Sequence, residues 1–254
     1  MLSLTVLIYL PKSPSLAKVT AKSVFDFCKS LQTSLTVAET IKLYGKSART
    51  RMAPHFKRAN VAYPPSRITL LSLKEERVLI VFAPDGKGGW KQITGYYVVG
   101  TSGKTGPKLR EGDLQIPEGY YKITGLYPNS IAHLGLRVNY PNGQDRLHAE
   151  KDKRTKLGGD ILIHGSYWST GCLAMGNVAI EELYVLANDV GCKNIEMIFA
   201  PCNLVTTKPK IDLKQQPEWV SSLYKELKST LKLYPIKIDP AWEAMAPAKP
   251  SSDD

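Results

Sequence analysis

The sequence predicts an α+β protein whose middle is mostly β and whose two ends are helical. Apolar residues recur at helical spacing near the start of the chain and again over residues 218–231. Between these ends they form short runs rich in β-branched side chains, separated by turn residues. With 254 residues, 43% hydrophobic and 22% charged, the composition is that of a folded protein. The length fits one large domain, or one domain with an attached segment.

Residues 18–58 are predicted to be helical: apolar residues recur at helical spacing from Val24 to Leu31, and Thr36 and Glu39 then have the spacing of a capping box. An apolar stripe follows them at helical spacing. Pro54 is expected to kink or end this helix, because a proline inside a helix removes a backbone hydrogen bond. The Pro64-Pro65 pair then marks a natural boundary.

After this boundary the apolar period changes from that of a helix to that of strands. The predicted elements are, in order, strands at 68–73, 77–82, 90–99, 119–125, 134–140 and 160–163, a helix at 178–187 with Asn177 as its N-cap, a strand at 194–199 and a helix at 218–231.

The formal net charge of +11 is concentrated at the start of the chain. Residues 1–60 contain ten Lys or Arg and two Asp or Glu, so eight of the eleven net positive charges lie there. Such a segment is typical of solvated helices, or of a segment that contacts an anionic membrane or cell wall. Nucleic-acid binding is not predicted, because no stripe of interleaved aromatic and basic residues is present.

Residues 1–10 form an apolar run of the length found in the hydrophobic part of a signal peptide. No Lys or Arg precedes Lys12, so the basic start of an ordinary signal peptide is missing. An export signal and a buried segment therefore both remain open. No run of 18 apolar residues occurs, so the body of the chain is not predicted to cross a membrane.

The stretch from Ile161 to Met175 carries the candidate catalytic residues. An apolar run leads to His164, and a turn-rich loop presents Cys172. A thiol with a pKa of roughly 8.5 is mostly protonated at neutral pH, so an imidazole that accepts its proton would activate it. Gly171 permits a tight turn, in which its N–H and that of Cys172 would face a developing oxyanion. Because no Asp or Glu lies within the stretch, the carbonyl of Gly165 is the expected partner of the imidazole.

The residues alone leave a second interpretation open, because a single Cys is most often a small buried hydrophobe and a single His is usually structural. The other cysteines lie in apolar runs and are predicted to be structural, namely Cys28, Cys192 and Cys202. A disulfide between the last two would require an oxidising compartment. The other histidines lack metal-ligand spacing, and neither a metal nor another cofactor is predicted; they are His55, His133 and His148.

Three motifs in the same stretch resemble the active site of a known family. They are His164-Gly165, Ser169-Thr170-Gly171-Cys172 and Leu173-Ala174-Met175. Their arrangement is similar to the motif of the L,D-transpeptidase catalytic domain of the YkuD type, in particular its YafK-like subgroup. The resemblance covers about residues 47–205 and includes further segments in the same order: Tyr63–Pro65, Lys74–Arg77, Gly106–Asp113, Pro117–Tyr121, Asn129-Ser130, Tyr140–Asn142 and Asp145-Arg146.

Two features depart from the commoner pattern of this family. That pattern has a longer insert after the first His and a second His directly before the Gly-Cys pair, where this chain has Thr170. It also has Arg or Asn shortly after the Cys, where this chain has Ala174 and Met175. The YafK-like subgroup shares both features, so catalysis is still expected, and the acceptor of the reaction is left open.

The resemblance implies a mainly β catalytic domain and a thioester chemistry. In that chemistry Cys172 attacks the carbonyl between an L-centre and a D-centre of a peptidoglycan stem peptide, and an amine or water resolves the thioester. His164 is implied as the general base, with Gly165 orienting its ring, and the N–H groups of Gly171 and Cys172 as oxyanion donors. The loop residues implied to shape the site and contact the substrate are Tyr167, Ser169 and Thr170. Carbapenems acylate the thiolates of this family.

The predicted function is that of a peptidoglycan L,D-transpeptidase. Two alternatives remain open: a hydrolase of the same family, either an L,D-carboxypeptidase or an amidase that detaches wall-linked peptides or proteins, and a non-catalytic wall-binding protein. The predicted partners are peptidoglycan stem peptides or a wall-linked protein, in the periplasm or cell envelope. The predicted parts of the chain are an apolar or signal segment 1–17, a basic helical segment 18–62, a catalytic domain 63–205, a C-terminal helical extension 206–245 and a disordered tail 246–254.

Overall fold

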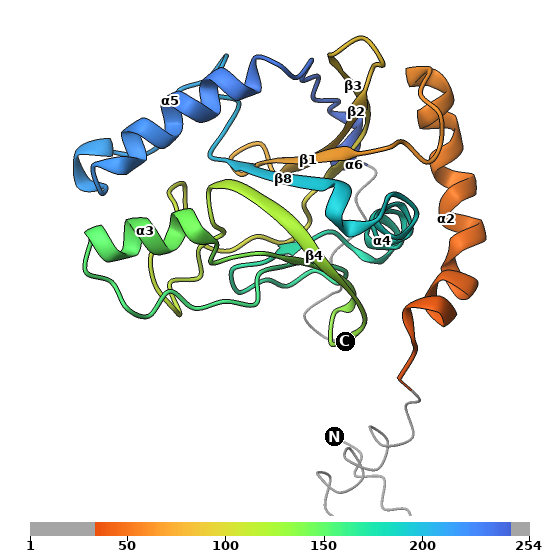
Figure 1. The fold of residues 1–254 in the computed structure, drawn as a ribbon, viewed down its shortest axis with the longest axis horizontal. Coiled ribbons are helices and arrows are strands. Elements are labelled where there is room, and N and C mark those ends of the chain that lie inside the picture. Colours follow the sequence, from red (N-terminus) through yellow and green to blue (C-terminus); the bar gives the residue numbers. More distant parts are fainter. Residues whose placement is uncertain (1–33, 245–254) are drawn as a thin grey trace, which may run out of the picture. The chain divides into compact units, whose positions relative to one another are not determined.

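The computed structural model describes residues 34–244, and those from Leu35 onward belong to one compact unit (Figure 1). The predicted segment 1–17, the first part of the predicted basic helix and the predicted tail 246–254 lie outside the described residues. No helix within residues 34–244 combines the length and the hydropathy needed to cross a bilayer.

A mixed eight-stranded sheet forms the centre of the described structure, with the strand order β3-β2-β1-β8-β4-β5-β6-β7. The strands are β1 (Ile68–Leu73), β2 (Val78–Pro84), β3 (Trp90–Tyr97), β4 (Gly119–Ser130), β5 (His133–Val138), β6 (Leu162–His164), β7 (Leu173–Ala174) and β8 (Ile195–Ala200). β1 pairs with β8 and β6 pairs with β7 in parallel, whereas the other neighbouring strands are antiparallel.

Helices cover both faces of this sheet. They are α2 (Val37–Ala59), α3 (Gly143–Lys151), α4 (Asn177–Val190), α5 (Trp219–Leu231) and α6 (Ala241–Ala244), with 3₁₀ turns at Cys192–Asn194 and Leu213–Gln215. Figure 1 shows α4 between α2 and the sheet, and α3 and α5 together at the other end. A mainly β middle with helices at its ends confirms the α+β prediction.

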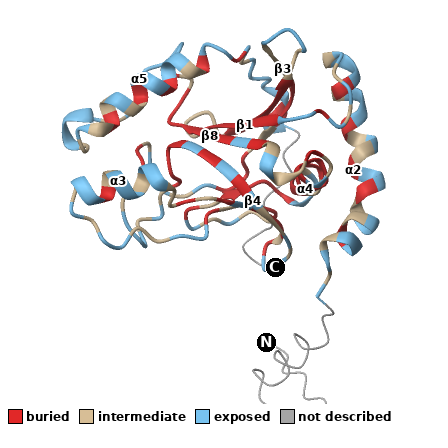
Figure 2. Ribbon diagram, in the orientation of Figure 1, coloured by how far each residue is buried: buried red, intermediate tan, exposed pale blue. Residues whose placement is uncertain are grey.

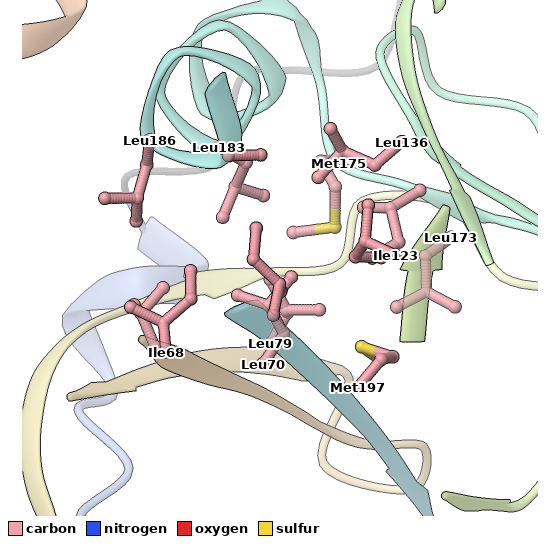
Figure 3. Packing of buried hydrophobic residues seen from close by; sticks show 14 of the residues in the cluster. Ile68, Leu70, Leu79, Ile123, Leu136, Leu173, Met175, Leu183, Leu186 and Met197 are labelled. Atoms are coloured by element: carbon pink, nitrogen blue, oxygen red, sulfur yellow. The ribbon is translucent and has the colours of Figure 1, made fainter. Parts of the chain in front are cut away.

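The central strands are buried on both faces, which explains their continuous apolar runs (Figure 2). In β1, Ile68 and Leu70 pack into the cluster beneath α4, whereas Leu71 and Leu73 point into the cluster beneath α5. Figure 3 shows that the first cluster also receives Leu173, the residue directly after Cys172. The sheet core therefore anchors the end of the candidate catalytic loop.

α2 belongs to the same compact unit as the sheet, so the predicted boundary at residues 62 and 63 lies inside that unit. Its capping box of Thr36 and Glu39 is formed as predicted. Its buried face, from Thr40 to Phe56, packs on α4 and β3. Arg49 also binds Asp189 of α4, with Nε 2.7 Å from Oδ2. Apolar burial and ion pairing thus hold α2 in place.

The structure corrects two local predictions. Pro54 does not end α2, which continues to Ala59. Pro54 is exposed, so water can satisfy the carbonyl that its missing N–H leaves free. Asn177 is the first residue of α4 and not its N-cap, which is Gly176, because the Asn177 side chain accepts a hydrogen bond from the N–H of Ser166.

The docking of α2 can be tested by truncating Phe56, which is 3% exposed in the main core cluster. Phe56→Ala should lower the free energy of unfolding by about 3–5 kcal/mol, because it leaves a cavity between α2 and the sheet. The control is Leu43→Ala on the same helix, where the side chain is 60% exposed and the change should stay within about 0.5 kcal/mol. Urea unfolding followed by circular dichroism measures both. Equal stability of the two variants would contradict the packing.

Candidate active site

The parallel pairing of β6 and β7 brings the two candidate catalytic residues together. Ile163 pairs with Leu173, and His164 pairs with Ala174. Cys172 lies directly before β7, and its Sγ is 3.4 Å from the backbone nitrogen of Leu162. Since side chains two residues apart share one face of a strand, this register places Cys172 and His164 on the same face of the strand pair.

Residues 165–172 connect the two strands through a tightly held loop. Ser166 and Gly171 have φ values of 61° and 110°, and a β-carbon at Gly165 would lie 2.7 Å from the carbonyl oxygen of Ala132. The loop is closed by the N–H of Met175, which donates to the carbonyl of His164 at 2.8 Å. Gly165 is therefore required by the close approach of the Ala132 backbone, and Gly171 by its positive φ.

His164 is 3% exposed, and its Nδ1 lies 2.6 Å from the carbonyl oxygen of Gly165. This is the contact that the sequence predicted. Because a carbonyl only accepts, Nδ1 carries the proton, and Nε2 of the neutral ring has a free lone pair. Burial lowers the pKa of His164, and the bond to Gly165 partly offsets this effect. The ring is therefore neutral and able to accept a proton at neutral pH.

The environment of Cys172 favours the protonated thiol. Burial raises the pKa of Cys172, and the N–H of Leu162, which points at the sulfur, lowers it by a smaller amount. Asp160 raises this pKa further and Lys108 lowers it. A raised thiol pKa beside a lowered imidazole pKa disfavours an ion pair in the free protein. The proton of Cys172 would therefore leave as the sulfur attacks.

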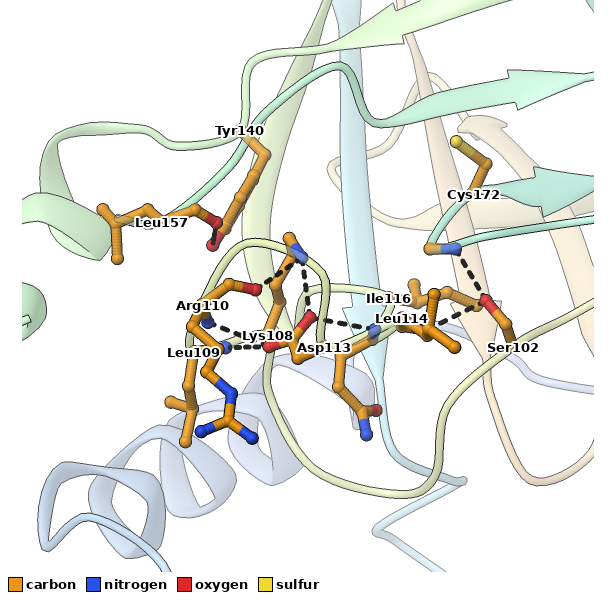
Figure 4. A network of polar contacts seen from close by, with 12 residues as sticks. Ser102, Lys108, Leu109, Arg110, Asp113, Leu114, Ile116, Tyr140, Leu157 and Cys172 are labelled. Carbon is orange, nitrogen blue, oxygen red and sulfur yellow. Dashed lines mark hydrogen bonds and ion pairs between the residues drawn. The ribbon is translucent and has the colours of Figure 1, made fainter. Parts of the chain in front are cut away.

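The two N–H groups predicted to face an oxyanion are already bonded to serine hydroxyls. The N–H of Gly171 donates to Oγ of Ser102 at 2.6 Å (Figure 4), and the N–H of Cys172 donates to Oγ of Ser169 at 3.0 Å. Ser169 in turn donates to the carbonyl of Cys172 at 2.6 Å. Both N–H groups therefore have a hydrogen-bond partner within the protein. Ser102 was missed because a single Ser in a Gly/Lys-rich loop gives no signal.

The remaining loop residues lie at the surface of the same loop. Tyr167 and Ser169 are half-buried, whereas Thr170 is exposed. Trp168, which the sequence did not single out, is 51% exposed, and its ring centre lies 5.8 Å from that of His164. The one sequence signal for Trp168 is that an aromatic residue stands between the His164-Gly165 pair and Ser169.

A cleft of about 690 Å³ lies between α3 and α5 and includes neither Cys172 nor His164. Within residues 34–244, no group of three or more His, Cys, Asp or Glu is placed to hold a metal ion. Cys192 and Cys202 are free thiols, and Cys28 lies outside the described residues.

The site is defined by a cysteine thiol and a neutral, backbone-oriented imidazole on one face of a strand pair. Residues 66–195, just over half of the chain, match the L,D-transpeptidase catalytic domain family, YkuD. The chain therefore belongs to this family, whose members are cysteine enzymes that act on peptidoglycan stem peptides. This confirms the resemblance seen in the sequence.

Two named relatives are similar to part of this chain. The "Putative L,D-transpeptidase YafK" of Escherichia coli (strain K12) is 31% identical over 144 residues, which are 56% of this chain and 54% of that protein. The protein of the same name from Escherichia coli O157:H7 gives the same values. The chain thus aligns with about half the length of each relative.

The chain is also similar to two solved structures. The helical cell shape determining protein Pgp2 from Campylobacter jejuni has a TM-score of 0.44 and 23% identity, over 63% of this chain and 54% of that one. Bd1075 from Bdellovibrio bacteriovorus has a TM-score of 0.40 and 20% identity, over 67% and 57% of the two chains.

The protonation state of Cys172 can be tested by alkylation with iodoacetamide. Because burial raises the pKa of the thiol, the alkylation rate should be low at pH 7 and should still be rising at pH 9. Peptide mapping by mass spectrometry separates Cys172 from the other cysteines, and N-acetylcysteine serves as the reference thiol. A rate that is already constant between pH 6 and pH 8 would reveal a preformed thiolate instead.

Proposed function

We propose that this protein is a peptidoglycan L,D-transpeptidase in which Cys172 is the nucleophile and His164 is the general base. The observation that carries the proposal is the hydrogen bond from Nδ1 of His164 to the carbonyl of Gly165, which leaves the lone pair of Nε2 free on a residue that the strand register places on the same face as Cys172. Membership of the YkuD family supplies the substrate class, a stem peptide.

The first half-reaction forms a thioester. The proton of the Cys172 thiol moves to Nε2 of His164 as the sulfur attacks the carbonyl carbon between an L-residue and a D-residue. The tetrahedral intermediate then collapses, and its C–N bond breaks. The departing amine of the D-residue takes the proton from His164, so that a neutral imidazole and an acyl-enzyme are left.

The second half-reaction resolves the thioester. An incoming amine of a second stem peptide attacks the carbonyl, and His164 accepts the proton that this amine loses. The sulfur leaves as a thiolate and regains that proton from His164, which restores the free enzyme. With water in place of the amine, the same steps hydrolyse the peptide. Transpeptidation and hydrolysis therefore differ in the acceptor and not in the residues.

The substrate places this protein in the bacterial cell envelope, and we extend the proposal to the periplasm. The exposed basic residues of α2 are available for peripheral contact with an anionic membrane or wall; they are Lys42, Lys46, Lys57 and Arg58. Stem peptides are the proposed partner, and a wall-linked protein is the partner if the enzyme acts as a detaching amidase.

The nucleophile is tested by Cys172→Ala with purified muropeptides. Turnover should fall at least 1000-fold, because no thioester can form. The control is Cys192→Ala, which removes a free thiol in the 3₁₀ turn after α4, outside the motif, and should keep wild-type activity. Mass spectrometry of the products identifies the reaction: a dimer means transpeptidation, loss of a terminal D-residue means carboxypeptidase action, and a released protein means an amidase. Undiminished turnover by Cys172→Ala would overturn the proposal.

The general base is tested by the pH dependence of kcat/KM. His164 must be neutral to accept the thiol proton, and burial lowers its pKa. Activity should therefore persist as the pH falls to 6.5, the ordinary value for His, and decline only below it. The expected profile loses activity toward acid with a midpoint below about pH 6.5. A midpoint above pH 7 would contradict a buried imidazole as the base.

A further inference from the structure

Ser102 links the nucleophile turn to a loop that lies far from it in the sequence. Its Oγ accepts the N–H of Gly171 at 2.6 Å and donates to the carbonyl of Leu114 at 2.9 Å. A serine hydroxyl has one proton and two lone pairs, so this proton is committed to Leu114. Ser102 therefore joins three chain segments through one oxygen atom (Figure 4).

Ser169 makes the matching arrangement on the other side of the turn. Its Oγ accepts the N–H of Cys172 and donates to the carbonyl of the same residue. The two serine oxygens are 3.4 Å apart. The successive N–H groups of Gly171 and Cys172 thus each donate to a serine hydroxyl, and the two hydroxyls lie in contact.

The loop that carries Ser102 is itself fixed against the turn. Gly100, two residues earlier, exchanges both backbone hydrogen bonds with Ala174 of β7, at 3.2 and 3.0 Å. A β-carbon at Gly171 would lie 3.3 Å from the carbonyl oxygen of Gln115. The nucleophile turn is therefore enclosed between β7 and the segment from residue 100 to residue 115.

We propose that Ser102 is a positioning residue, which holds the Gly171–Cys172 peptide so that Sγ of Cys172 meets the bound carbonyl at a productive angle. Without this hydroxyl the N–H of Gly171 and the carbonyl of Leu114 both lose their partner, and Gly171 is free to rotate. A nucleophile displaced by about 1 Å can lower the rate about 100-fold. This role rests on the proposed function, because it needs a substrate carbonyl to be attacked.

The test compares two reactions of Cys172 in the full chain. Acylation by a carbapenem requires the sulfur to meet a carbonyl in a bound molecule, whereas alkylation by iodoacetamide requires only a reactive thiol. Ser102→Ala should slow acylation about 10- to 100-fold and leave the alkylation rate within about twofold. Ser102→Thr and Ser102→Val have the same shape and differ in the hydroxyl, so Thr should restore acylation and Val should not. Ser229→Ala, which removes an exposed serine-to-backbone bond in α5, is the control.

Hydrogen exchange gives a readout that does not depend on activity. Exchange of the Gly171 amide should quicken at least tenfold in Ser102→Ala and Ser102→Val and remain slow in Ser102→Thr. Failure of the wild-type protein to be acylated would overturn the proposed function. Three results would each overturn the role of Ser102. They are acylation of Ser102→Ala at the wild-type rate, an equal loss of the acylation and alkylation rates, and an unchanged exchange rate of the Gly171 amide.

Discussion

Parallel neighbouring strands are ordinarily joined by a dozen residues or more, because the chain has to return to the end at which it started. β6 and β7 are joined by residues 165–172 alone. Ser166 and Gly171, both with positive φ, supply the turns, and the side chain of Asn177 holds the loop through the N–H of Ser166. The candidate nucleophile and base therefore stand at the two ends of one short connection, and its closure sets their geometry.

Burial acts in opposite directions on the pKa values of the two candidate catalytic residues. It raises the pKa of Cys172 and lowers that of His164, so the uncharged forms are favoured in both cases. The bond from His164 to a carbonyl, and not to a carboxylate, adds no charge that would stabilise an imidazolium. Charge would then develop at these two groups only as the sulfur attacks.

Local signals allowed most of the architecture to be predicted, and long-range contacts account for what was missed. The strand runs and the motif around Cys172 are continuous in sequence, so periodicity and resemblance detect them. Asn177 was misassigned because its side chain accepts a hydrogen bond from the N–H of Ser166, eleven residues earlier, and does not cap its own helix. Ser102 lies 69 residues before Gly171, and no local pattern reveals that they meet. The bond from the N–H of Gly171 to Ser102 was therefore not foreseen.

The net charge also has a different meaning in the folded protein. Arg49 binds Asp189, and Arg51 binds Glu181 and Glu182, so part of the basic excess of α2 is neutralised by α4. Exposed ion pairs are individually weak, but these lie along an apolar contact that already buries one face of the helix. Since α4 starts directly after β7 and the candidate site, α2 supports the element on which that site rests. Arg49 and Arg51 therefore act first as an internal attachment, and the exposed bases of α2, including Arg58, are the part of the charge that an anionic surface could contact.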